Sequence, residues 1–231
     1  EVEYRNISLA FKTSVGTIGV GYMDAGVEGI ERTALINGDT EVIGTGEMFG
    51  YKNRVIKVGY QQSLSESFHI GVNGVGYINE IDTYLGTGYS IDVGGIYEFH
   101  DLTVSLFARN LIPTKVKYSD SADPTYSGEE TLPLQTVFGL SYPFGDLDVM
   151  GQFKFDGTNS LMSAGLDYTP EFLWDALTLS AGYKEYSVLD KTSNTITLGV
   201  GLNLFGLSLD YAYEKSDHFE YEANNFASVG F

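Results

Sequence analysis

The chain has 231 residues, a length that suits one domain with a large interior or one closed barrel. Its 28 Gly, 17 Tyr and 14 Phe, set against only 5 Pro, favour strands and tight turns over helices, because aromatic side chains fit pleated surfaces. The formal net charge of -18 disfavours nucleic acid as a partner, since phosphates require Lys and Arg. The same charge disfavours docking onto a bare anionic lipid surface.

Two sequence features narrow the class of protein further. No stretch has the roughly 18 uninterrupted apolar residues of a membrane-spanning helix, and residues 1–4 do not open a signal peptide. We therefore expect a mature or truncated chain. Cysteine is absent, so the fold must close by hydrogen bonds and not by disulfides.

Thirteen short segments, each bounded by turn residues, alternate between apolar and polar side chains. This period of two residues is typical of strands whose two faces meet different environments. Several segments reach the roughly 9–11 residues that a tilted strand needs to cross a bilayer. In chain order the segments are 5–12, 16–24, 48–63, 68–80, 89–99, 102–112, 132–144, 147–157, 161–170, 177–188, 194–205, 207–216 and 225–231.

Segment 194–205 shows the alternation most clearly. Small or polar residues such as Thr195, Thr197 and Asn203 fall on one face, and apolar residues fall on the other. In an outer-membrane barrel the apolar face meets lipid and the polar face lines the lumen. We therefore expect an outward row of Ile196, Leu198, Val200, Leu202 and Leu204.

The connections between segments differ in length in a regular way. Short turns on one rim and long loops on the other are typical of outer-membrane barrels, with the long loops outside. The expected tight turns are 13–15, 64–67, 100–101, 145–146 and 205–206. The expected long, polar and mostly acidic loops are 25–47, 113–131, 189–193 and 217–224.

Together these patterns predict an all-β fold, an antiparallel up-and-down transmembrane β-barrel of about 13–14 strands formed by residues 1–231 as a single domain. The expected location is the bacterial outer membrane, with a cell-surface or extracellular assembly as the alternative. The lipid bilayer is then the first partner. The barrel-assembly machinery is expected to recognise the terminal strand through Phe231.

An odd number of strands leaves the first segment without an antiparallel partner, because closure of such a barrel needs an even number. Bare backbone groups in hydrocarbon cost several kcal/mol each. We therefore expect the edge formed by Ile7, Leu9 and Phe11 to be paired in the native particle, by upstream sequence or by a strand from another subunit.

Four stretches of the chain carry a resemblance to a known family. They are "GTIGVGYMDAGVEGIERT" (16–33), "YSIDVGGIYEFHDLTVSLFARN" (89–110), "LPLQTVFGLSYPF" (132–144) and "NTITLGVGLNLFGLSLDYAYEKSDHF" (194–219). They resemble the carboxy-terminal part of the PorV/PorQ family of outer-membrane barrels, which looks like a distant relative of FadL-type fatty-acid transporters. The resemblance implies about fourteen strands and an amino-terminal plug with an Asn-Pro-Ala-Gly motif. This sequence does not contain that plug segment.

Ten charged residues fall on the inward side of the alternation. Their signs are roughly balanced, which permits pairing across a lumen and gives no selectivity ring of one sign. They fit both a wet channel and a lumen filled by paired side chains, and the second is favoured. The lumen-lining candidates are Lys12, Lys57, Asp92, Arg109, Asp148, Lys154, Asp167, Lys184, Asp210 and Glu214.

No residue pattern points to catalysis, to a metal or to a cofactor. The three histidines, His69, His100 and His218, lie far apart and form no metal-ligand spacing. The glycine clusters 44–46 and 71–74 open no helix, so they are expected to be turn or bulge glycines and not phosphate loops. We expect a protein that is not an enzyme.

Two functions remain open on the sequence alone. The first is porin-like passage of small or hydrophobic solutes, or a scaffold for secretion partners, and it predicts monomers or small oligomers in detergent. The alternative is a structural barrel subunit that joins neighbouring chains, as a homo-oligomer, by strand complementation. That alternative predicts polymers that persist without lipid.

Overall fold

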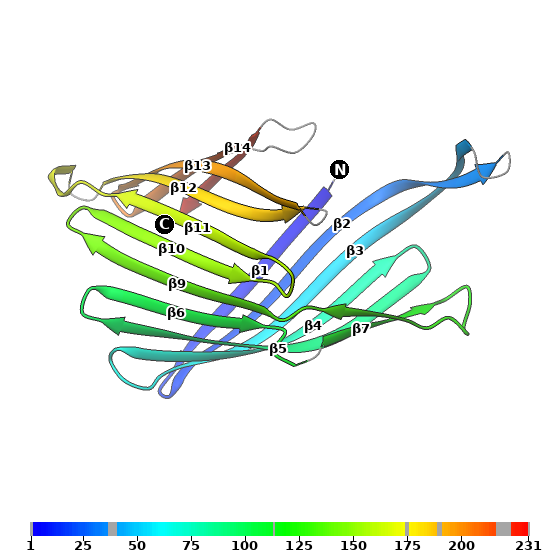
Figure 1. The fold of residues 1–231 in the computed structure, drawn as a ribbon, viewed down its shortest axis with the longest axis horizontal. Coiled ribbons are helices and arrows are strands. Elements are labelled where there is room, and N and C mark those ends of the chain that lie inside the picture. Colours follow the sequence, from blue (N-terminus) through cyan, green and yellow to red (C-terminus); the bar gives the residue numbers. More distant parts are fainter. Residues whose placement is uncertain are drawn as a thin grey trace. The chain divides into compact units, whose positions relative to one another are not determined.

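The computed structural model describes residues 2–36, 41–112, 114–173, 176–188, 191–215 and 223–230 (Figure 1). Among these residues no helix has the length and apolar character needed to cross a bilayer. The elements are β1 (Val2–Thr13), β2 (Gly16–Ile36), β3 (Glu41–Ser63), β4 (Phe68–Ile81), β5 (Tyr84–Phe99), β6 (Leu102–Arg109), β7 (Thr114–Asp120), β8 (Gly128–Leu132), β9 (Gln135–Phe144), β10 (Leu147–Phe155), β11 (Ser160–Tyr168), the 3₁₀ turn η1 (Glu171–Leu173), β12 (Leu177–Val188), β13 (Lys191–Leu204), β14 (Leu207–Lys215) and β15 (Ala223–Gly230).

The strands follow one another in the sheet in nearly the order of the sequence. The path runs β1-β2-β3-β4-β5-β6-β9-β10-β11-β12-β13-β14-β15, and β7 and β8 form a side hairpin attached to β5 through β7. Consecutive strands pair antiparallel wherever their register is defined. The predicted all-β, antiparallel up-and-down fold is confirmed, and all thirteen predicted segments coincide with strands.

The five predicted tight turns are also confirmed, since each lies between consecutive strands. They need backbone conformations that most residues avoid, because His100, Phe205, Gly145 and Gly206 have φ between 55° and 83°. Glycine adopts such angles at little cost, and the two non-glycine residues accept strain to keep the hairpins short.

The predicted loop at 25–47 is wrong, because β2 and β3 continue through most of it as one paired ribbon. The register shifts between Val27 and Ile30 and again between Glu31 and Thr33, and each bulge shifts the side-chain alternation of one strand relative to the other. Gly29 and Gly46 lie in these irregular stretches with φ of 72° and 77°. The period of two is therefore broken in the sequence although the strands persist.

The predicted loop at 113–131 is wrong as well, since it contains β7 and β8, which pair with each other. In β7 the buried Thr114 and Val116 alternate with the exposed Lys115 and Lys117. This short alternation was a strand signal that the surrounding acidic residues obscured. The predicted connections at 189–193 and 217–224 lie largely outside the described residues, although β13 already begins at Lys191 and β15 at Ala223.

The chain divides into two compact units. Unit 1 comprises Glu1–Leu64, Ile70–Val93 and Ala108–Leu134. Unit 2 comprises Ser65–His69, Gly94–Phe107 and Gln135–Phe231.

The apolar face of unit 1 is exposed and not buried. On β1 the outward residues Ile7, Leu9 and Phe11 are 64%, 60% and 57% exposed. Among all described residues only Val75, Val116 and Leu161 are buried hydrophobic side chains, too few for a water-soluble core. Lipid is the solvent that can cover such a surface, as in transmembrane barrels.

Unit 2 has the same arrangement. The predicted outward row of Ile196, Leu198, Val200, Leu202 and Leu204 is exposed, whereas Thr195 on the other face of β13 is 3% exposed. The register places Leu198 beside Ala181 and Tyr213, and Thr197 beside Gly182 and Glu214. The alternation thus separates an apolar face from a small and polar one.

Replacement of Leu198 by Arg should cost about 2–4 kcal/mol of folding free energy, because an outward cation near the bilayer midplane cannot be hydrated. Thr197→Arg is the control, and it should cost less because Glu214 lies opposite on the polar face. Reversible folding into lipid vesicles along a urea series measures both variants. Equal costs at the two sites would contradict the assignment of the two faces.

Candidate functional site

A row of charged side chains crosses the outer face of unit 1 directly after the apolar residues. Arg5 on β1 lies opposite Asp24 on β2, and Asp24 lies opposite Arg54 on β3. Arg54 donates two hydrogen bonds, of 3.0 and 2.9 Å, to the carboxylate of Glu80 on β4. The charges alternate in sign from strand to strand. Ionised groups are costly in the hydrocarbon but tolerated at its interface, so this row marks the edge of the bilayer.

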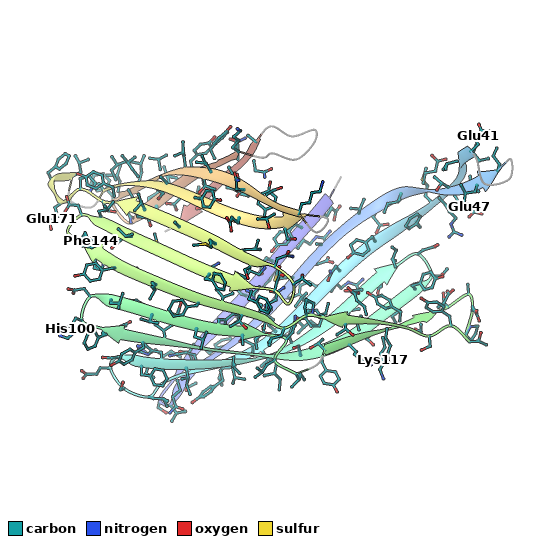
Figure 2. All side chains as sticks on the ribbon, viewed as in Figure 1. Glu41, Glu47, His100, Lys117, Phe144 and Glu171 are labelled. Atoms are coloured by element: carbon teal, nitrogen blue, oxygen red, sulfur yellow. The ribbon has the colours of Figure 1, made fainter. Side chains whose placement is uncertain are left out.

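The strands β2 and β3 extend far beyond this charged row. They have 21 and 23 residues, about twice the roughly 9–11 that a tilted strand needs to cross a bilayer. Residues 25–36 and 41–53 lie past the row, and at about 3.3 Å per residue they form a ribbon roughly 40 Å long. Figure 1 shows the ribbon continuing past the turn between β4 and β5, and Figure 2 places Glu41 and Glu47 at its far end.

The ribbon, which continues β2 and β3, also contacts the turn between β4 and β5. The backbone N–H of Asp82 donates to the carbonyl of Gly50 at 3.1 Å. The guanidinium of Arg32 donates to both carboxylate oxygens of Asp82, at 2.7 and 2.5 Å. Glu47 adds a second carboxylate 3.5 Å from Arg32. Arg32 is therefore already paired with two carboxylates of the same unit.

These contacts border a groove of about 730 Å³ on the rim of unit 1. Tyr84 and Tyr126 meet edge to face with ring centroids 5.0 Å apart. The groove is lined by Ile30, Glu31, Arg32, Thr33, Phe49, Ile81, Asp82, Tyr84, Tyr118 and Tyr126. Its volume lies within the range of binding pockets for small molecules or a few side chains.

Polar contacts fix the β7–β8 hairpin beside the groove. Tyr118 donates its hydroxyl hydrogen to Glu130 at 2.8 Å and accepts a hydrogen bond from Asn79 at 3.0 Å. Burial raises the pKa of the Tyr118 phenol, so this hydroxyl remains a donor at neutral pH. On the same hairpin Lys115 contacts Glu129 at 2.6 Å.

A second polar network lies on the inward face of unit 1. The buried carboxylate of Asp92 accepts the backbone N–H of Asn110 at 3.1 Å, and the ammonium of Lys57 lies 4.0 Å away. The Asn110 side chain donates to the carbonyl of Pro133 at 2.9 Å and accepts from the Tyr77 hydroxyl at 3.0 Å.

Asn110 is the centre of this network because the strand is interrupted there. It has φ of 54°, a conformation that Asn tolerates better than most residues, and it ends β6 before β7 begins. The next residue, Leu111, donates its N–H to Ile91 at 2.9 Å. The hydrogen bond to Asp92 thus satisfies a backbone N–H that a regular strand would have paired in its ladder, and Tyr77 satisfies the side-chain oxygen of Asn110.

The inward face of unit 2 is lined by small residues. They surround open space of about 500 Å³ bordered by Ser141, Gly151, Ser163, Gly165, Ser180 and Gly182 among others. Asp167 lies at its edge and directly opposite Asp148 on the neighbouring strand, so two carboxylates face each other. This arrangement leaves room on the polar face and places like charges close together.

The structure joins some of the predicted lumen-lining residues and separates others. Lys57 approaches Asp92, Lys184 lies 3.5 Å from Glu214, and Asp210 accepts a hydrogen bond from Ser228 at 3.1 Å. Lys12 pairs across strands with the uncharged Thr17, and Lys154 with Val137 and Leu161. Arg109 ends β6, next to the interruption.

The uncharged residues of the site are not indicated by any pattern in the sequence. Asn110 and Tyr77 carry no motif, and the aromatic residues Tyr118 and Tyr126 are notable in the sequence only as rings within an acidic stretch. Of the histidines, His69 lies 4.0 Å from Glu98 in unit 2, while His218 and the terminal Phe231 fall outside the described residues. Within the described part of the chain, no group of three or more His, Cys, Asp or Glu could hold a metal ion.

Replacement of Asn110 by Ala should destabilise the protein by about 2–4 kcal/mol, because it leaves buried polar partners without a hydrogen bond and because Ala tolerates a positive φ less well than Asn. Asn110→Gly relieves the backbone strain but not the lost hydrogen bonds, so its cost should be intermediate. Asn203→Ala, at an exposed position, is the reference. Urea unfolding in lipid vesicles, followed by circular dichroism, measures all three. A wild-type midpoint for Asn110→Ala would contradict this role.

The ion pair on β7–β8 predicts a pH dependence. The hydrogen bond from Lys115, and then its charge, hold the pKa of Glu129 below its ordinary value. The pair therefore stabilises the hairpin at neutral pH, and this contribution is lost as the pH falls through the lowered pKa. In Lys115→Gln the pKa of Glu129 should rise toward the ordinary value of a glutamate, because the hydrogen bond and the charge of Lys115 are both removed. Carbon-13 NMR titration of the glutamate carboxyls measures the shift, and identical midpoints would count against the pairing.

Two solved structures of an iron transporter are similar to this chain. The FrpB iron transporter from Neisseria meningitidis, F5-1 variant in its apoprotein form, is 10% identical, with a TM-score of 0.48 over 92% of this chain and 50% of that chain. The F3-3 variant is 9% identical, with a TM-score of 0.47 over 99% of this chain and 52% of that chain. The chain thus spans about half the length of these transporters. The search of curated proteins gave no match.

A family model described as "Type IX secretion system membrane protein PorP/SprF" matches residues 37–228, well over half of the sequence. It includes the end of the β2–β3 ribbon, the groove residues on β4 to β7 and nearly all of unit 2. The resemblance to the PorV/PorQ family is thereby corrected, while the expected outer-membrane location is confirmed. This chain belongs to the PorP/SprF family of type IX secretion system membrane proteins, which are β-barrels of the bacterial outer membrane.

Proposed function

We propose that this chain is a scaffold that holds a secretion partner on the rim of unit 1, at the β2–β3 ribbon and the β7–β8 hairpin. One observation carries the proposal. Twelve residues of β2 lie beyond the charged row at Arg5, Asp24, Arg54 and Glu80, yet they remain in a paired strand. A strand that served only to cross the membrane would end near that row.

The surface of the ribbon supports a protein partner. Leu35, Val42 and Met48 are 58%, 62% and 63% exposed in a part of the chain that lies past the bilayer edge. Lipid does not cover them there, and large apolar side chains exposed outside the membrane are typical of interaction surfaces. The ribbon therefore combines an ordered backbone with apolar contact sites.

The proposed role is binding and not catalysis. The contacts in the rim are ion pairs and hydrogen bonds that hold strands together, such as those of Arg32 with Asp82 and of Tyr118 with Glu130. Recognition of the terminal strand by the barrel-assembly machinery, and strand complementation by a neighbouring copy at Ile7, Leu9 and Phe11, remain predictions from the sequence.

Passage of small or hydrophobic solutes is the second candidate. The small residues on the inward face of unit 2 favour it, because they leave about 500 Å³ of open space. Passage and scaffolding differ in what the ribbon contributes. A pore needs the inward face and not the ribbon, whereas a scaffold needs the ribbon itself.

Replacement of residues 29–49 by an Asn-Gly turn tests the scaffold, because Glu28 and Gly50 are close enough to be joined by a hairpin turn. We expect the variant to reach the outer membrane, binding of the partner protein to weaken by about tenfold or more, or ~1.4 kcal/mol, and secretion of the partner to fall as a result. Secretion into the medium is measured by quantitative mass spectrometry.

The control replaces the opposite turn, residues 64–67, by the same dipeptide and should leave secretion unchanged. Normal secretion by the ribbon deletion would contradict the scaffold. Reduced secretion by both variants would indicate a general assembly defect and would also contradict the specific role of the ribbon.

A further inference from the structure

The groove on the rim of unit 1 is lined mostly by aliphatic and aromatic side chains. Six of its ten lining residues are aliphatic or aromatic: Ile30, Phe49, Ile81, Tyr84, Tyr118 and Tyr126. Tyr126 is 43% and Ile81 is 38% exposed, so the groove is open to a ligand. Since the ribbon beside it lies past the bilayer edge, lipid chains of the membrane are not its natural cover.

The charge around the groove is negative. Its only lining cation among the described residues, Arg32, is paired with Asp82 and Glu47. Glu31 lines the groove and accepts the backbone N–H of Gly46 at 3.2 Å, and no Lys or Arg in the described part of the chain pairs with it. A cationic ligand would therefore meet an available carboxylate.

The neighbouring hairpin adds to this negative potential. Asp120 lies directly opposite Tyr84, and its charge is the first cause of the raised pKa of the Tyr84 phenol. Asp123 is held by Thr125 within the turn, at 2.9 and 2.6 Å, and its charge also raises the pKa of Tyr84. The carboxylates of Asp82, Asp120 and Asp123 thus lie near Tyr84, and Glu31 lines the groove with Asp82.

Rings beside carboxylates bind the side chains of basic peptides well, because Arg and Lys stack on aromatic faces while their charge pairs with the acid. The open strand edges of the rim suit an extended peptide, since β8 has β7 as its one strand partner in the described sheet. A fatty acid would place its own carboxylate among like charges. The charge distribution therefore selects against an anionic lipid.

We propose that this groove binds an extended segment of the secretion partner in which aliphatic or aromatic side chains alternate with Lys or Arg. The apolar side chains would contact Phe49, Tyr84 and Tyr126, and the cations would pair with Glu31 and the carboxylates of the hairpin. This inference rests on the scaffold role proposed above and names the site and the chemistry of the partner.

Binding of short synthetic peptides to the full chain in lipid nanodiscs tests the inference by fluorescence anisotropy. The probe is a labelled octapeptide of alternating Lys and Leu or Phe. Two comparison peptides have Glu in place of Lys, or Ser in place of Leu and Phe. We expect the basic-apolar peptide to bind best and its affinity to fall with salt, since charge pairing at an exposed rim is screened.

Two groove variants and two matched controls locate the site. Tyr126→Ala removes one wall, and Glu31→Gln removes a charge but keeps the acceptor for Gly46. Each should weaken the basic-apolar peptide by about fivefold to tenfold. Phe172→Ala and Glu171→Gln make the same chemical changes in η1 of unit 2 and should leave binding unchanged.

Equal binding of the basic and acidic peptides, or equal affinities for all four variants, would overturn the inference. Displacement of the peptide by laurate, with laurate held more weakly by the two groove variants, would assign the groove to lipid and overturn it as well. The scaffold role is judged separately by the ribbon deletion. If that deletion lowers secretion while no peptide binds, the scaffold stands and this partner chemistry fails.

Discussion

The satisfaction of backbone hydrogen bonds without water is the constraint on which the rest of this structure depends. In hydrocarbon an unpaired N–H or C=O group has no solvent partner, so a strand that crosses the membrane must pair with its neighbours. Pairing fixes the direction of each side chain, and the period of two then places Leu198 outward and Thr197 inward. Unlike a water-soluble protein, this protein therefore exposes its apolar side chains and has polar side chains on the opposite face of each strand.

The constraint ends where the bilayer ends, and the sequence changes character at that level. Up to Tyr22 on β2 the outward residues are apolar, and from Asp24 onward they are charged or irregular. Bulges that would expose backbone groups to lipid are tolerated near Ile30 and Thr33, because water can hydrate them. Strand β2 therefore alternates regularly in the half within the bilayer and irregularly in the half beyond it.

This change in the alternation explains how much of the structure could be predicted from the sequence. The alternation predicted every strand within the membrane, the tight turns and the outward row on β13, because lipid enforces a strict period. It failed at residues 25–47 and 113–131, where the strands stay paired but bulges or surrounding acidic residues obscure the alternation. The pairing of Lys57 with Asp92 joined two predicted inward residues, but the role of Asn110 depends on a strand interruption that no local pattern indicates.

The family resemblance was limited for the same physical reason. Strands of small and apolar residues recur in many barrels, so the segments at 89–110 and 194–219 indicated the outer membrane but not the correct family. Most residues of the groove, such as the aromatic residues Tyr84 and Tyr126, lie outside the segments that alternate regularly.

The charged row on β1 to β4 has a consequence for the depth of unit 1 in the membrane. A shift of two residues in one direction would move the charged row of Arg5, Asp24, Arg54 and Glu80 into hydrocarbon. A shift in the other direction would expose the apolar side chains next to the row to water. Both displacements are costly, so the immersion depth has a single minimum. Because the ribbon beyond the row is continuous and paired, a molecule held at its far end is kept at a defined height, some tens of ångströms above the lipid surface.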